Sequence, residues 1–316
     1  MGQSGQGRRD STAVRPFQVG TVSRTFFAVP LWVGIERGFF ADEGVEVGLS
    51  IFGNASQVEP LESGRMHTAI ASPEAVLQNA HRGGPLRFVA GNAGRLSHFF
   101  IAQPRFKRVE DLRGATIGIL NMVEGTFFQL QEIMARHGMS YPADYKVVET
   151  GGAPPRHKAL LEGSIDAGLQ SIPWAYIEEE AGFSNLGDVA DYVPDWQFTT
   201  VNANRDWAAQ NRDALVRFLR ALLKSTDWVY ENRDGTSAVV QKEMEMSRAH
   251  AERGWDYYTG RSVLTRDLGF NTKGLDKVVR AQIQAGLLSP DAAADPGDYV
   301  EPSYLEEARA SLKTRR

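Results

Sequence analysis

The chain has no cysteine among its 316 residues. Structural disulfides, thiolate metal sites and cysteine nucleophiles are therefore excluded. It also lacks any run of eighteen or more apolar residues, so no segment of the sequence is expected to span a membrane. With 35 basic and 39 acidic side chains, the formal net charge is −4. Without a basic excess, we do not expect nucleic acid as a partner.

Other common signatures are absent as well. The six histidines show no metal-ligand spacing, so we expect no metal and no cofactor. The glycine-rich segment 151–156 lacks the Lys-Ser/Thr ending of a phosphate-binding loop, and its two prolines remove backbone donors. Residues 1–16 are polar and glycine-rich and are predicted to be a disordered arm.

The chain does contain a repeated pattern. Residues 61–74 read LESGRMHTAIASPE, and residues 161–174 read LEGSIDAGLQSIPW. Each copy predicts the end of a helix, a glycine stop, a short apolar strand and a proline that opens the next helix. Two α/β lobes of similar build are therefore expected. Ligands bind at the carboxyl ends of parallel strands, so the loops at Ser72 and Ser171 are predicted to form two walls of one cleft.

The alternation of strands and helices sets the expected domain boundaries. Lobe 1 is predicted to be discontinuous and to comprise residues 17–103 and 203–316, and residues 104–202 are predicted to form lobe 2. Two connections near Gln103 and Asn202 would then form the hinge. From Arg205 onward the pattern is helical, and we expect these C-terminal helices to pack on lobe 1, because a helix needs an apolar partner.

These features together resemble a known family. Residues 30–44 read PLWVGIERGFFADEG, residues 109–118 read VEDLRGATIG, and both repeat copies fit the same pattern. Over residues 17 to 290 the chain resembles the NMT1/THI5-like solute-binding proteins of ABC importers, the sulfonate, nitrate and taurine type. The resemblance implies the type II periplasmic-binding-protein fold, in which two α/β lobes joined by a two-strand hinge enclose a small molecule.

The same fold also carries enzymes. The resemblance includes a pyrimidine-precursor synthase, but its catalytic histidine and cofactor-bearing lysine fall at Glu74 and Ile70 here. An aromatic sulfinate desulfinase uses a cysteine, which this chain lacks. Decarboxylases of dihydroxyphthalate type are not excluded. The alternative to a binding protein is therefore a cytoplasmic enzyme on the same fold, either a decarboxylase or lyase with Glu74, Arg24 and His98 as an acid–base set or an enzyme like the pyrimidine-precursor synthase.

Candidate binding residues follow the strands of both lobes. Thr25 offers a hydroxyl beside a helix start, and the helix at Thr126 offers backbone N–H groups to a carboxylate or sulfonate. Trp174 would stack on a ring or pack as an ordinary helix start, and an unpaired Glu74 would disfavour a simple oxyanion unless it pairs with Arg24. The full set is Arg24, Thr25, Phe26, Phe27, Ser72, Glu74, Asn121, Gly125, Thr126, Gly152, Ser171 and Trp174.

The leading hypothesis is a solute-binding protein whose lobes close over a small organic ligand that is aromatic, heterocyclic or carboxylate- or sulfonate-bearing. Its expected partner is an ABC permease, and we expect a monomer without catalytic residues. A sensor lobe coupled to a signalling partner is a weaker possibility. The expected location is periplasmic or extracellular if an export signal has been removed, and cytoplasmic in the alternative.

Overall fold

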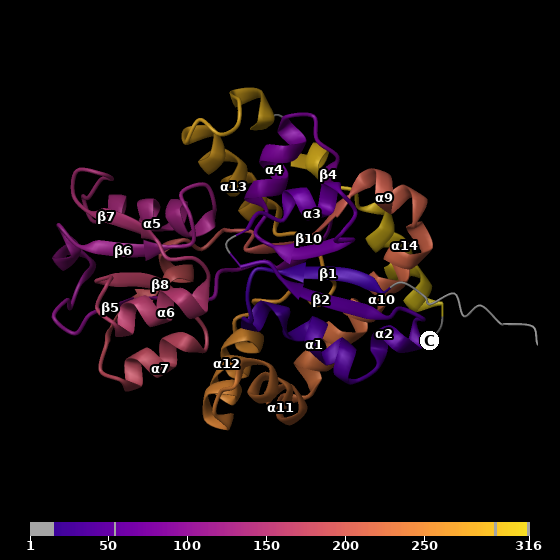
Figure 1. The fold of residues 1–316 in the computed structure, drawn as a ribbon, viewed down its shortest axis with the longest axis horizontal. Helices are drawn as coiled ribbons and strands as arrows, with labels where there is room; N and C mark the ends of the chain where they lie inside the picture. Colours follow the sequence, from indigo (N-terminus) through magenta and orange to yellow (C-terminus); the bar gives the residue numbers. More distant parts are fainter. Residues whose placement is uncertain (1–15, 54, 294–295, 315–316) are drawn as a thin grey trace, which may run out of the picture.

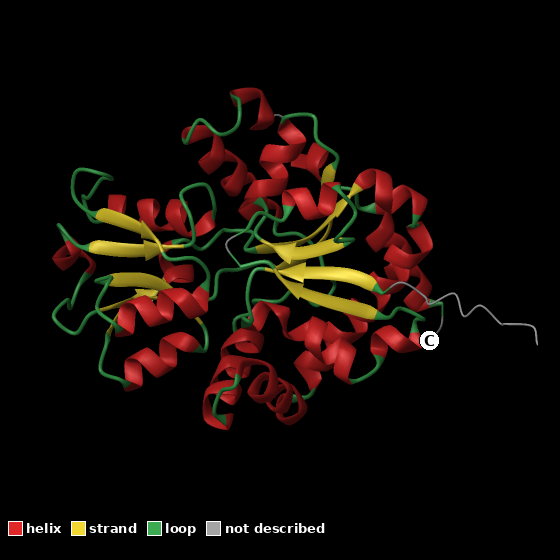
Figure 2. Cartoon of the chain, in the orientation of Figure 1, coloured by secondary structure: helices red, strands yellow, loops and turns green. Residues whose placement is uncertain are grey.

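The computed structural model describes residues 16–53, 55–293 and 296–314, which form two α/β lobes side by side (Figure 1). The predicted arm lies outside the described residues except for Pro16. Each lobe is built on one five-stranded sheet, and helices flank both sheets (Figure 2). No helix in the described part of the chain combines the length and the apolar character needed to cross a bilayer.

The sheet of the first lobe has the strand order β2-β1-β3-β10-β4. β1 is parallel to β2 and β3, whereas β10 is antiparallel to β3 and β4. The carboxyl ends of β1 and β3 therefore lie at the same edge, which faces the other lobe. The strands are β1 (Phe17–Thr21), β2 (Val47–Ile51), β3 (Thr68–Ala71), β4 (Leu86–Ala93) and β10 (Thr199–Asn204).

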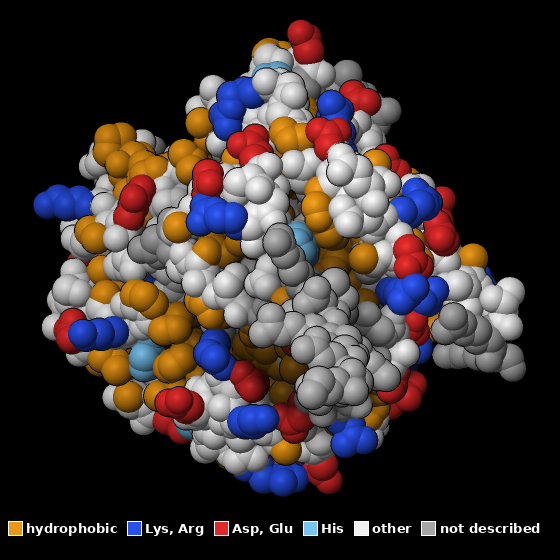
Figure 3. Space-filling view, turned by 45° about the vertical axis from the view of Figure 1, so that its right-hand side comes forward, with side chains coloured by type: hydrophobic (Ala, Val, Ile, Leu, Met, Phe, Trp, Pro, Cys, Tyr) orange, Lys and Arg blue, Asp and Glu red, His pale blue; other side chains and the backbone are white. Residues whose placement is uncertain are grey.

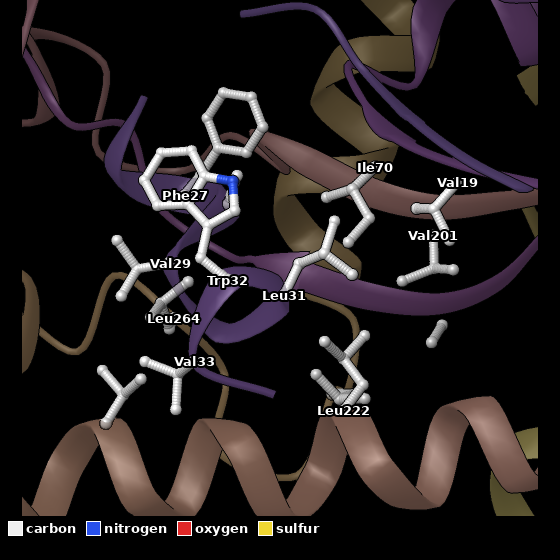
Figure 4. Packing of buried hydrophobic residues seen from close by; sticks show 14 of the residues in the cluster. Val19, Phe27, Val29, Leu31, Trp32, Val33, Ile70, Val201, Leu222 and Leu264 are labelled. Carbon is white, nitrogen blue, oxygen red and sulfur yellow. The ribbon is translucent and has the colours of Figure 1, made fainter. Parts of the chain in front are cut away.

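The helix after β1 anchors this lobe. It carries a proline in its first turn, and it ends just before Gly38, whose φ of 79° is left-handed. Leu31 of this helix lies between Ile70 of the sheet and Leu222 of α10, and all three are fully buried (Figure 4). The helices in this part are η1 (Phe26–Ala28), α1 (Val29–Glu36), α2 (Phe39–Asp42), α3 (Val58–Glu62) and α4 (Glu74–His81).

The second lobe repeats the plan with the strand order β7-β6-β8-β5-β9. β6 is parallel to β7 and β8, and β5 is antiparallel to β8 and β9. The strands are β5 (His98–Ala102), β6 (Thr116–Ile119), β7 (Lys146–Glu149), β8 (Ala167–Ser171) and β9 (Ser184–Asp188). The helices are η2 (Val109–Leu112), α5 (Gly125–Arg136), α6 (Ala153–Leu161), α7 (Trp174–Glu180) and α8 (Val189–Tyr192).

The repeat has the structure that its sequence predicts. Gly64 and Gly163 follow α3 and α6 with φ values of 72° and 73°, and β3 and β8 come next. These strands are the central members of the two sheets. Ser72 directly follows β3, and Ser171 is the last residue of β8. These two serines lie on opposite sides of the interface between the lobes.

The expected lobe boundaries differ from the structure at both crossings. β5 was assigned to lobe 1, but it is hydrogen-bonded to β8 and β9 of the second sheet. All of β10 belongs to the first sheet, although the expected boundary cut through it. The crossings are therefore residues 94–97 and 193–198. Alternation along a sequence predicts a strand, but only the hydrogen-bond partners decide its sheet.

The C-terminal helices pack mainly on the first lobe, as expected. α10 lies against α1, α2 and α14, and α11 lies against α1. Two helices also reach the second lobe: Arg253 of α12 pairs with Glu179 at 2.9 Å, and Lys277 of α13 pairs with Glu132 at 2.7 Å. The helices and turns are α9 (Arg205–Gln210), α10 (Arg212–Glu231), α11 (Arg233–Met244), α12 (Arg248–Gly260), α13 (Thr272–Gln284), η3 (Pro290–Ala293), η4 (Pro296–Tyr299) and α14 (Ser303–Lys313).

Charged side chains are mixed over the surface. On the face seen in Figure 3, Lys and Arg alternate with Asp and Glu, and no large area carries a single sign. Elsewhere in the described part of the chain, many charged side chains pair with each other, for example Arg233 with Asp256 at 2.8 Å. Such a face does not generate the positive field that attracts a polyanion.

Candidate functional site

A small cavity lies between the lobes, where the carboxyl ends of strands from both sheets meet. Its volume is about 60 Å³. One buried water needs roughly 10–15 Å³ of such space, so the cavity has room for a compact chemical group. Its walls are Val22, Ser23, Thr25, Phe27, Ser72, His98, Leu120, Thr126, Gly152, Ala153, Arg156, Ser171, Phe198 and Thr199.

Arg156 of α6 brings a positive charge into this cavity. The side chain is only 2% exposed, and its Nη1 donates a hydrogen bond to the Gly151 carbonyl at 3.0 Å. Its Nε has no hydrogen-bond partner among the described residues. Burial lowers the pKa of Arg156 to about 10, which still leaves the guanidinium charged at neutral pH. An unpartnered, buried N–H of this kind binds an anionic oxygen strongly.

Two glycines make room for this arginine. Gly118 of β6 and Gly168 of β8 are paired neighbours in the parallel register. A Cβ atom on Gly168 would lie 3.1 Å from Cδ of Arg156, and one on Gly118 would lie 3.3 Å from Cγ. Larger residues at these positions would displace the arginine stem. Without side chains of their own, the two paired glycines leave space for the arginine stem to lie against β6 and β8.

His98 forms a second polar wall. It begins β5 opposite Ser171 of β8, and its ring meets Phe198 edge-on at 4.9 Å. The side chain is buried, and Nδ1 has no partner among the described residues. Burial, followed by the charge of Arg156, lowers the pKa of His98 to about 3. The imidazole is therefore neutral under ordinary conditions and adds no second positive charge.

The first lobe contributes hydroxyl and aromatic groups. Thr25 precedes η1 in an extended conformation, and its buried Oγ1 has no hydrogen-bond partner in the described part of the chain. Phe27 is held by an edge-on contact with Phe198 at 5.6 Å. A Cβ on Gly152 would lie 3.4 Å from Ser23, so the two lobes touch at this place. A ligand here would contact both lobes at once.

Half of the residues predicted from the sequence line this cavity. Phe27 and Thr25 do so from the first lobe, together with Ser72, and Thr126, Gly152 and Ser171 do so from the second. Thr126 is the second residue of α5, and its hydroxyl accepts a hydrogen bond from the Leu120 N–H at 2.9 Å. The arrangement supports these residues as candidates, and their contact with a ligand stays a prediction.

The other predicted residues lie elsewhere. Arg24 is half exposed and pairs with Glu243 of α11. Phe26 is buried in the core, 4.4 Å from the ring of Tyr258. The half-buried ring of Trp174 is 4.9 Å from His157. Glu74 and Gly125 are buried beside each other outside the cavity, and Asn121 lines a separate crevice.

The proposed acid–base set is not assembled. Arg24 is bound to Glu243 on the surface, while Glu74 and His98 are both buried. Ile70, the position of the lysine in the synthase pattern, is a core residue of the first lobe (Figure 4). Among the described residues, no group of three or more His, Asp and Glu side chains could hold a metal ion.

The chain is similar in sequence to known proteins. A family model described as "NMT1/THI5 like" matches residues 26–236. A Brucella abortus protein, provisionally named as a binding protein, is 25% identical over 92% of this chain and 91% of its own length. A 4-amino-5-hydroxymethyl-2-methylpyrimidine phosphate synthase from Saccharomyces cerevisiae is also 25% identical, over 65% of this chain and 64% of the yeast protein.

Among solved structures, the periplasmic nitrate-binding protein of Synechocystis is similar with a TM-score of 0.79. Its sequence identity is 14%, and the match covers 96% of this chain and 90% of that protein. This likeness establishes the type II periplasmic-binding-protein fold that the sequence predicts. It applies to the fold of both lobes.

Proposed function

This chain belongs to the NMT1/THI5-like family, and from that premise we propose that it is the solute-binding protein of an ABC importer. The observation that carries the proposal is the unpartnered Nε of buried Arg156 in a cavity shared by both lobes. A buried polar group without a partner costs roughly 1–3 kcal/mol, and more when it is charged. A bound anion would relieve that cost.

The solute is a compact organic acid. Its carboxylate or sulfonate lies against Arg156, Thr25 hydrogen-bonds to it from the other lobe, and Phe27 and Phe198 enclose its apolar part. The cavity of about 60 Å³ favours a small molecule over a large aromatic one. One formal positive charge in the cavity, with His98 neutral, matches a monoanion better than a dianion.

Binding and closure are coupled through contact with both lobes. A ligand shifts an open–closed equilibrium only as far as its affinity for the two states differs. An acid held by Arg156 alone would bind both states equally. Contacts with Thr25 and Ser72 exist only after closure, so they supply the difference. The crossings at residues 94–97 and 193–198 are the positions at which the hinge bends.

A permease is the proposed partner, and a location outside the cytoplasm is the proposed setting. Support comes from the Synechocystis relative, which is described as periplasmic. A catalytic role has less support, since Glu74 and Ile70 replace the histidine and lysine of the synthase pattern and His98 stays neutral. Incubation with aromatic carboxylates should give binding without product, and turnover would favour the enzyme.

The test begins with native mass spectrometry of the purified protein, which detects a co-purified solute. Thermal-shift measurements then use acetate, benzoate, methanesulfonate, nitrate and phosphate as probes. We expect stabilisation by at least one organic monoanion and its loss in Arg156→Met, a change that keeps the side-chain stem. Arg65→Met, at an exposed surface arginine, is the matched control. Equal stabilisation of Arg156→Met and the native protein would contradict the proposal.

A further inference from the structure

Two carboxyl groups from opposite lobes meet at a second place in the interface, outside the cavity. Glu74 is the first residue of α4 in the first lobe, and Glu124 immediately precedes α5 in the second. The Ser72 hydroxyl donates a hydrogen bond across the interface to Oε2 of Glu124 at 2.9 Å. A Cβ on Gly125 would lie 3.1 Å from Oε1 of Glu74, so this carboxyl rests on the start of α5.

Glu74 has no neutralising partner. It is fully buried, and neither carboxyl oxygen makes a well-formed hydrogen bond with the described residues. The nearby Ser72 hydroxyl and the Glu74 backbone N–H lower its pKa, but they offset only part of the effect of burial. The same Cβ position on Gly125 lies 2.9 Å from the amide Nε2 of Gln129 and 3.7 Å from the indole Nε1 of Trp196, and both of these side chains are uncharged. The charged group that acts on Glu74 is Glu124, which has the same sign.

The other ionisable groups on the surrounding elements are engaged with each other or open to water. Arg82 and Glu149 line the same crevice as Glu124, and Arg82 is exposed, so solvent screens its charge. Three of these groups form hydrogen bonds with neutral partners: His81 with the Ser289 N–H, Glu62 with Asn79 and Arg87 with the Gly84 carbonyl. Others form ion pairs: Glu59 with Arg65, Glu132 with Arg136 and Lys277, and Asp276 with Arg280. Asp298 lies on η4, which packs against α4, and its charge acts on Arg87.

Two carboxylates brought together away from water cannot both stay ionised, and one of them keeps a proton. Burial, and then the charge of Glu124, raises the pKa of Glu74 to about 8. Burial also raises the pKa of Glu124, against the hydrogen bond from Ser72. When the lobes separate, water reaches both groups, and each pKa returns toward the ordinary glutamate value of about 4.3.

We propose that Glu74 and Glu124 form a proton-dependent latch: the lobes close with uptake of one proton, and rising pH opens them. At a pH below the ordinary glutamate pKa, Glu74 is protonated in both the open and the closed form, and closure is most favourable. Closure becomes less favourable as the pH rises toward the pKa that Glu74 has in the closed form. Between these limits the closure constant falls by up to about tenfold per pH unit.

The latch can be tested on the solute-free protein, so its failure is separate from failure of the proposed function. Because the chain has no cysteine, dyes can be attached at Ile51→Cys on β2 and Val148→Cys on β7, which are 45% and 44% exposed. Single-molecule energy transfer between them reports the separation of the lobes. The distance distribution is measured at pH 5.5 and pH 8.5 in this labelled protein.

Four versions of the labelled protein are compared. We expect the parent to shift from the closed to the open distance as pH rises, by at least tenfold in the ratio of the two populations. Glu74→Gln should stay closed at both pH values, and Glu124→Gln should respond less than the parent while keeping the part of the response that comes from burial of Glu74. Glu306→Gln, at an exposed site on α14, is the control and should behave as the parent does. A parent whose distances do not change, or a Glu74→Gln variant that opens as the parent does, would overturn the latch.

Discussion

The cavity at Arg156 and the carboxyl pair at Glu74 lie in the same interface but have opposite requirements. The cavity contains a buried cation with an unpartnered Nε, and the carboxyl pair contains one fully buried acid and one partly buried acid without a cation. The first has a free N–H donor, for which we propose an anionic solute as the partner, while the Glu178 carboxyl also acts on the arginine charge. The second needs a proton, which the solvent supplies at any time. The comparison suggests that solute and pH act on closure through separate groups.

The largest effect is expected at the cavity. Arg156→Met should weaken binding of the best organic acid by about 2–5 kcal/mol, a factor of roughly thirty to several thousand, because a buried charge-assisted hydrogen bond is lost. Isothermal titration calorimetry of the variant and of the Arg65→Met control gives the two affinities. An Arg156→Met affinity within threefold of the control would show that the anion binds elsewhere.

The carboxyl pair should dominate the pH dependence of stability. The pKa of Glu74 is about 8 in the fold and near 4.5 in the unfolded chain, so its stabilising contribution is complete below pH 4.5 and is lost as pH rises to 8. Glu74→Gln should therefore be more stable than the native protein at pH 8 by about 2 kcal/mol or more. Urea unfolding at pH 6 and pH 8 measures this, with Glu306→Gln as control. A native protein whose urea midpoint does not fall between these pH values would contradict it.

A smaller effect is expected at Thr25, where one substitution should change the stability of the apo protein and the affinity for the solute in opposite directions. Thr25→Val removes a buried hydroxyl that has no partner without solute. The apo variant should be more stable by about 1 kcal/mol, and its affinity for the acid should fall by about fivefold. Thermal unfolding with and without the acid tests both signs. A loss of apo stability would mean that the hydroxyl has a partner in the apo protein.

We expect protonation of His98 to have no effect on the affinity for the solute near neutral pH. Because burial holds the pKa of His98 near 3, the histidine stays neutral from pH 5 to 7.5. In the Glu74→Gln background, affinity for methanesulfonate, which is ionised throughout this range, should stay within threefold. An affinity that rises as pH falls through 6.5 would show that His98 gains a proton and that the cavity carries two positive charges.

The strand ends that form the site follow from the sequence because the repeat fixes them. A glycine stop, an apolar strand and a proline-opened helix occur twice, and Ser72 and Ser171 lie at the predicted walls. Thr25 and Thr126 were found by the same rule. Local pattern is sufficient here, because the carboxyl ends of parallel strands must share an edge.

Features that depend on contacts between residues far apart in the chain could not be predicted from the local sequence pattern. The sheet of β5 depends on hydrogen bonds to β8 and β9, which the residues of β5 do not specify. Arg156 lies one turn inside α6, after two prolines, where a solvated side chain is the ordinary expectation. The signal that could have revealed it is the pair Gly118 and Gly168, which makes sense only once their strands are known to be neighbours.

The most direct measurement is a crystal structure of the protein with the best-binding organic acid. We expect the acid between the lobes, with one oxygen within hydrogen-bond distance of Arg156 Nε and another near Thr25 Oγ1. An acid that contacts only one lobe, or that binds away from Arg156, would contradict the clamp between the two lobes.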